Sequence, residues 1–68
     1  MKYVAMYCDY IRGSRKIAEA NSKVFITNRV KNYLIAHHRT LIGMYDAGNN
    51  ILVEFDSKYD FISIEAVQ

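Results

Sequence analysis

Residues 21–38, NSKVFITNRVKNYLIAHH, decide the fold, because the hydrophobic period changes there from that of a strand to that of a helix. Apolar and aromatic side chains recur at i, i+4, i+7, i+8 and i+11, a spacing that places them on one helical stripe. Asn21 and Ser22 precede the pattern and are favoured helix N-caps. We therefore expect a helix over residues 23–38, with this stripe packed on a sheet: Ile26, Val30, Tyr33, Leu34 and His37.

A strand is the alternative for the same stretch. Five of its apolar residues share parity, as side chains on one strand face do: Val24, Ile26, Val30, Leu34 and Ala36. Asn28 and Asn32 would interrupt that apolar face, so the helix is favoured. On the helix, Val24 and Ile35 point away from the packed stripe. They could form a second contact surface, and two copies of the chain could associate there or through an exposed strand edge.

The segments on either side of the helix alternate with period two, which is typical of strands. Turn-forming residues separate them at 12–14, 47–50 and 57–60. The expected strands are residues 2–11, 15–20, 40–46, 51–56 and 61–67. The order β-β-α-β-β-β predicts an α+β fold, a small two-layer domain with an antiparallel sheet and one covering helix.

The alternation in the first strand gives two faces. We assign Val4, Met6 and Cys8 to the face that meets the helix, and Tyr3, Ala5 and Tyr7 to the other. The predicted core then has ten members: Val4, Met6, Cys8, Ile26, Val30, Leu34, Val53, Phe55, Ile62 and Ile64.

Length and composition favour one small globular domain, residues 1–68. The chain has 68 residues, of which 51% are hydrophobic, with no proline and one cysteine. This composition excludes a collagen-like or disordered chain and an intramolecular disulfide framework. No apolar run approaches the roughly 18 residues that span a bilayer, and no signal-peptide core is visible. We expect a soluble cytoplasmic protein with no membrane association.

Charge is divided unevenly along the chain. Residues 1–39 carry eight basic and two acidic side chains, whereas residues 40–68 carry one basic and five acidic side chains. Such asymmetry indicates an interaction surface. The alternative is self-compensation, in which the basic half packs beside the acidic half.

No residue pattern predicts catalysis, a metal site or a cofactor. Adjacent helical residues point about 100° apart, so His37 and His38 cannot chelate one metal as an i, i+4 pair does. Cys8, assigned to the core, is expected to be inert. The terminal carboxylates Glu54, Asp56, Asp60 and Glu65 fit a solvated hairpin, and no glycine opens a phosphate-binding helix.

Tyrosines and cations are the better indication of function. Tyr3 and Tyr7 share a strand face near Arg12 and Lys16, and aromatic residues beside cations are typical of surfaces that bind single-stranded nucleic acid. Tyrosine is equally typical of protein interfaces. We favour a non-enzymatic regulatory protein that binds a protein partner, with nucleic acid as the alternative. The candidate binding residues are Tyr3, Tyr7, Arg12, Lys16, Lys23, Arg29 and Lys31.

The stretches KIAEANSKVFITNRVKNYL and ILVEFDSKYDFISIEAV resemble the small epsilon subunit of Firmicute RNA polymerases over roughly residues 16–67. The likeness is greatest in VEFDSKYDFISIEA, whereas the first hairpin is more basic and tyrosine-rich than that family's. The resemblance implies a compact accessory protein of a larger machine, with a fold also used by a small phage inhibitor of RNA polymerase. A prokaryotic or phage transcription or defence context follows from it. It identifies no specific binding residue.

Overall fold

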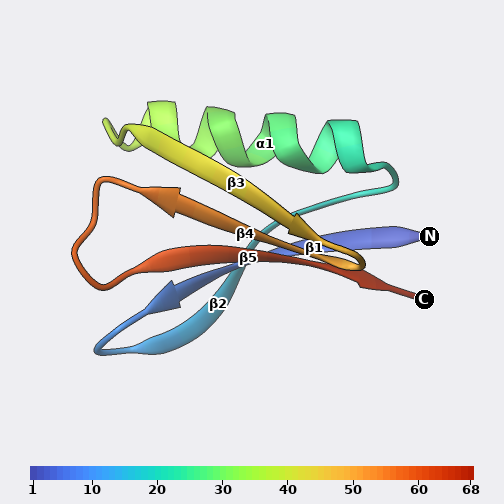
Figure 1. Cartoon of the computed structure of the whole chain (residues 1–68), viewed down its shortest axis with the longest axis horizontal. Coiled ribbons are helices and arrows are strands. Elements are labelled where there is room, and N and C mark those ends of the chain that lie inside the picture. Colours follow the sequence, from blue (N-terminus) through green and yellow to red (C-terminus); the bar gives the residue numbers. More distant parts are fainter.

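The computed structural model describes all residues, 1–68, as five strands and one helix (Figure 1). Strands β1 (Lys2–Asp9) and β2 (Gly13–Ala20) precede helix α1 (Lys23–Ala36). Strands β3 (Leu41–Ala47), β4 (Asn50–Phe55) and β5 (Phe61–Val67) follow it. All paired strands are antiparallel and the sheet order is β2-β1-β5-β4-β3. The predicted α+β class and element order are confirmed.

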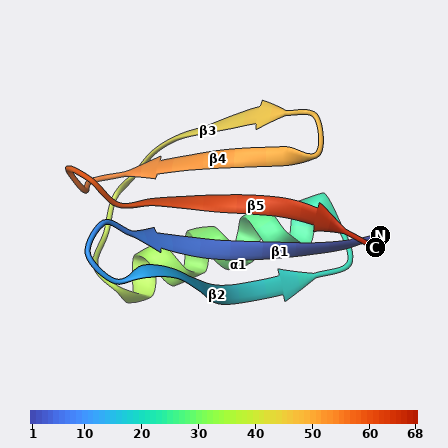
Figure 2. The same cartoon turned by 90° about the horizontal axis from the view of Figure 1, so that it is seen from below.

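Helix α1 covers one face of the sheet and leaves the other open. It packs mainly on β2 and β1, and Figure 2 shows it behind the strands, with the uncovered face toward the viewer. The termini lie together at one end of the sheet (Figure 2). The β1–β2 turn and the β4–β5 loop lie together at the opposite end.

The helix begins and ends for local chemical reasons. The side chain of Ser22 accepts a 3.1 Å hydrogen bond from the backbone N–H of Phe25, which confirms the predicted N-cap. The helix ends at Ala36, two residues earlier than predicted, because His38 takes a left-handed conformation with φ of 57°. His37 is the C-cap and is exposed, so its predicted place in the packed stripe is wrong. Its ring stacks on Tyr33 at 4.1 Å.

The core confirms the predicted members of α1, β4 and β5 and corrects those of β1. Ala5 and Tyr7 are buried, and Tyr3 packs against them on the helix side. Val4, Met6 and Cys8 lie only partly buried on the open face, so their assignment to the core is wrong. Alternation defines two faces without saying which one meets the helix. The complete buried core is Ala5, Tyr7, Ile26, Val30, Leu34, Ile51, Val53, Phe55, Ile62 and Ile64.

Candidate functional site at the turn end of the sheet

Exposed apolar side chains gather at the end of the sheet away from the termini. We call this region the turn end: Tyr10–Arg12 between β1 and β2, and residues 57–60 between β4 and β5. Ile11 is 90% exposed, Tyr10 66% and Tyr59 61%. A shallow hollow of about 540 Å³ lies between the two connections. Large apolar side chains held this far out of the core are candidates for contact with a partner.

Asp9 fixes the β1–β2 turn. Its Oδ1 accepts hydrogen bonds from the backbone N–H groups of Ile11 at 2.9 Å and Arg12 at 3.1 Å. These two bonds lower the pKa of Asp9, and nearby Arg12 and Arg15 lower it further. Gly13 closes the turn with φ of 87°, a conformation that glycine adopts without strain. These contacts restrain the backbone that carries Ile11.

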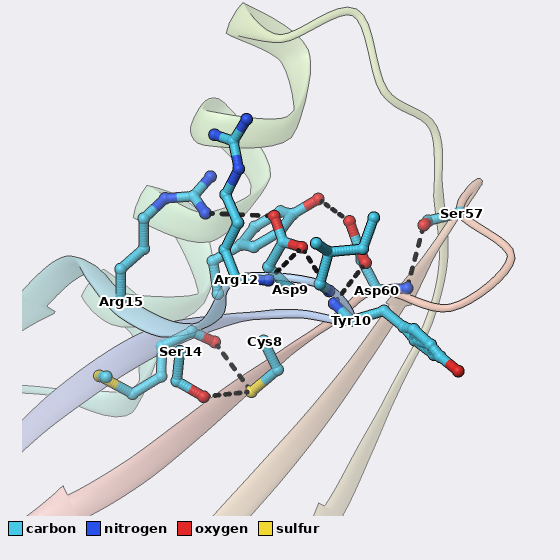
Figure 3. A network of polar contacts seen from close by, with 11 residues as sticks. Cys8, Asp9, Tyr10, Arg12, Ser14, Arg15, Ser57 and Asp60 are labelled. Carbon is cyan, nitrogen blue, oxygen red and sulfur yellow. Dashed lines mark hydrogen bonds and ion pairs between the residues drawn. The ribbon is translucent and has the colours of Figure 1, made fainter.

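Asp60 ties the two connections together (Figure 3). Its Oδ2 accepts a 2.7 Å hydrogen bond from the hydroxyl of Tyr7, and its Oδ1 accepts a 3.0 Å bond from the backbone N–H of Tyr10. The backbone N–H of Asp60 donates to Oγ of Ser57 at 3.1 Å. Burial, and then the bond to Asp60, raises the pKa of Tyr7 to about 12. The β4–β5 loop is thus anchored to the core and to the neighbouring turn.

Aromatic rings and cations line the outside of this anchored frame. The rings of Tyr10 and Tyr59 lie 4.8 Å apart, centroid to centroid. Nζ of Lys58 lies 5.4 Å from the centre of the Tyr59 ring. Neither Arg12 nor Lys58 forms an ion pair. The turn end therefore offers apolar, aromatic and cationic contacts, while its carboxylates are engaged in holding the loops.

The structure does not bring the sequence-predicted site residues together. Tyr3 is half-buried and Tyr7 is buried under the helix, with Cζ of Arg15 at 4.4 Å from its ring centre. The expectation of an exposed Tyr3–Tyr7 platform is therefore wrong for Tyr7. Arg12 lies at the turn end, and Lys16 lies on the open face of β2. Three further candidates lie on the helix: Lys23, Arg29 and Lys31.

Part of the charge asymmetry is compensated within the molecule. Lys23 pairs with Asp46 at 2.7 Å and Arg39 with Asp56 at 3.0 Å, and both pairs join the basic half to the acidic half. Lys2, Arg15 and Lys16 pair with carboxylates of their own half. Four cations form no ion pair: Arg12, Arg29, Lys31 and Lys58. These four are the cations most available to a partner.

Groups with catalytic or metal-binding potential do not converge. No set of three His, Cys, Asp or Glu side chains is placed to hold a metal ion. The Sγ of Cys8 accepts a 3.6 Å hydrogen bond from the hydroxyl of Ser14 on the open face (Figure 3). Helix α1 is too short and too polar to cross a membrane.

No family model, curated protein or solved structure matches the chain. The resemblance to the epsilon subunit of Firmicute RNA polymerases therefore stays a prediction.

Sequence reasoning missed Ile11, Lys58 and Tyr59, and Tyr10 as part of this site. Residues 2–11 read as one uninterrupted strand, so Ile11 and Tyr10 counted as strand residues. The available signal was Asp9, whose side chain favours a turn two or three residues on. If the strand had been predicted to end at Asp9, Ile11 would have been placed in a turn. An exposed isoleucine in a turn has no structural benefit, so it would have stood out as a candidate contact residue.

Proposed function

We propose that this chain is a small non-enzymatic regulatory protein that binds a protein partner through the turn end, with Ile11 as the anchor. The observation that carries the proposal is the exposure of Ile11, which is 90%. Ile11 lies in a turn in which its own backbone N–H and that of Arg12 both donate to the carboxylate of Asp9. Exposing an isoleucine gains nothing for folding. Burial in a partner's pocket would contribute on the order of 2 kcal/mol.

A protein partner suits the residues around the anchor. Tyrosine and arginine are enriched among the residues that dominate protein-binding energy, and Tyr10, Tyr59 and Arg12 line the same hollow as Ile11. The bonds to Asp9 and Asp60 order both connections before binding. This preorganisation lowers the entropic cost of association.

The charges at the turn end specify the partner's chemistry. Arg12 and Lys58 have no ion pair within the chain, so they favour an acidic rim around an apolar pocket. The sequence resemblance supports a cytoplasmic accessory protein of a larger prokaryotic or phage assembly, of which the transcription machinery is the leading candidate.

Capture from a lysate of the source organism tests the proposal. Wild-type protein is compared with I11D and with I42D, which places the same charge at another exposed isoleucine, 63% exposed, on β3. We expect wild type and I42D to retain one partner and I11D to lose it. Equal retention by I11D, or no protein above background with folded wild type, would count against the proposal.

Nucleic acid is the alternative at the same residues, because Tyr10, Tyr59, Arg12 and Lys58 could supply stacking and phosphate contacts. The salt dependence of binding distinguishes a nucleic-acid partner from a protein partner. Affinity for nucleic acid falls steeply as the salt concentration rises, in proportion to the number of phosphates contacted. Binding of oligonucleotides at low salt that is lost in Y59A and R12A would favour this alternative.

A further inference from the structure

The open face of the sheet is apolar at its centre. Tyr45 opposes Leu52, Leu52 opposes Ser63, and Ser63 opposes Met6, so these side chains form a row across four strands. Phe61 lies beside the row and is 39% exposed, with Leu52 at 43% and Tyr45 at 51%. The hydroxyl of Tyr45 would lie 2.9 Å from a Cβ at Gly43, which shows that its ring lies along the sheet. No part of the chain covers this face (Figure 2).

Two carboxylates without cation partners share this face. Glu54 is two residues from Leu52 on β4, and Glu65 is two residues from Ser63 on β5. Neither forms an ion pair, and a hydrogen bond with Glu54 raises the pKa of Tyr45. The lysines of the face, Lys2 and Lys16, lie toward β2 and both pair with Glu19. Lys58 lines the end of the β4–β5 half beside Glu54, so this half carries two unpaired carboxylates and one unpaired cation and is acidic on balance.

The outward side of α1 has the opposite sign. Val24, Lys31 and Ile35 share one helical stripe, and Phe25 and Arg29 share the next. Val24 is 66% exposed, Phe25 63% and Ile35 70%. Lys31 and Arg29 form no ion pair. This surface is thus apolar with free cations, and it lies on the opposite side of the molecule from the open face.

We propose that the outward side of α1 in one copy docks on the open sheet face of a second copy. A helix-to-helix dimer would bring only cations together. In a sheet-to-sheet dimer the carboxylates of the β4–β5 half could meet Lys2 and Lys16 of the second copy, but both of these lysines already pair with Glu19. The helix-to-sheet arrangement brings the unpaired cations of α1 to the unpaired carboxylates of the open face, beside apolar side chains on both surfaces. Such a contact uses different surfaces on the two copies, so it propagates as a chain or a ring and does not stop at a two-fold dimer.

The contact is weak and depends on concentration. The molecule is small, with extents of 31 × 21 × 19 Å, so one side of it offers limited area beside the roughly 800 Å² that each partner buries in a standard stable interface. The turn end borders the open face, because Lys58 and Tyr59 line one hollow with Leu52 and Glu54. Ile11 and Arg12 do not line that hollow, so variants at these two positions separate partner binding from self-association.

Sedimentation velocity of wild type and two charge-reversed variants tests the proposal. We expect the wild-type average mass to rise from 7.9 kDa past twice that value with concentration. E54K/E65K carries cations on both surfaces and R29E/K31E carries carboxylates on both, so each alone should stay monomeric. Their equimolar mixture should co-assemble, because each helix then meets a sheet of opposite charge. The control variant R12E reverses an unpaired cation that does not line the hollow of Leu52 and Glu54, and it should associate as wild type does.

Three results would overturn the proposal. The first is that the wild-type protein stays monomeric up to about 1 mM. The second is that its assembly stops at a dimer. The third is that the equimolar mixture of E54K/E65K and R29E/K31E fails to assemble although both variants are folded. I11D should self-associate normally. Self-association of I11D therefore tests the helix-to-sheet contact separately from the proposal that the turn end binds a partner.

Discussion

The hydroxyl of Tyr7, in the buried core, donates a 2.7 Å hydrogen bond to Asp60, in the loop between β4 and β5. The two residues are 53 positions apart in the sequence. The same carboxylate accepts the backbone N–H of Tyr10 at the tip of the neighbouring turn. The geometry of the turn end is therefore coupled to the packing of the core.

Stability should fall at high pH because of Tyr7. Its pKa is raised from 10.0 to about 12 in the folded state, so the folded form retains a proton that the unfolded form loses between these values. The contribution is fully present below pH 10 and is lost as pH rises toward 12. Urea midpoints of wild type should decline over this window, whereas Y7F should decline less. Parallel declines would show that Tyr7 is not the group responsible.

Removal of the Asp60 carboxylate should loosen the turn end. D60A deprives the Tyr7 hydroxyl and the Tyr10 amide of their acceptor, and a polar group left unpaired costs about 1–3 kcal/mol where it is buried. Amide hydrogen exchange at Tyr10 should become faster, while exchange in α1 should change only by the global loss of stability. An unchanged exchange rate at Tyr10 would contradict the anchoring role of Asp60.

The helix should be anchored through Leu34, which is 1% exposed. L34A should lower the free energy of unfolding by about 2–5 kcal/mol, because it removes buried contacts and leaves a cavity. The neighbouring variant I35A, at a residue 70% exposed, should change it by no more than about 0.5 kcal/mol. Urea titration measures both. Similar losses would mean that the helix packs by another stripe.

The corrected assignment of β1 can be tested with a pair of variants. Ala5 is fully buried under α1, so A5L should overpack the core and cost about 1–3 kcal/mol. Cys8 lies on the open face, so C8S should change stability by no more than about 0.5 kcal/mol. Thermal unfolding of the two variants decides the matter. A larger loss of stability for C8S than for A5L would indicate that Cys8, and not Ala5, faces the core.

The fold followed from the sequence because periodicity is local. The cap at Ser22 and the stripe of Ile26, Val30 and Leu34 defined the helix, and alternation defined the strands. The face of β1 did not follow, because Val4, Met6 and Cys8 are as apolar as the residues that replaced them. Tyr7 enters the core because its ring can be buried while its hydroxyl reaches Asp60 at the edge. That partner is distant in sequence and invisible to a local pattern.

The candidate site was only partly foreseeable. Arg12 was identified from its turn and its charge, and it does lie at the turn end. Tyr59 and Tyr10 come together only because β1 and β5 are neighbours in the sheet, an order that local sequence patterns do not predict. The partial pairing of charges, such as Lys23 with Asp46, likewise required the arrangement of α1 against β3.

Site-specific photo-crosslinking in cells tests the role of Ile11 most directly. A benzophenone amino acid is placed at position 11, and at the control position 42, in otherwise wild-type protein. We predict a dominant crosslink from position 11 to a protein other than the chain itself, and none of that mass from position 42. The same products from both positions, or no product from position 11, would contradict binding through the turn end.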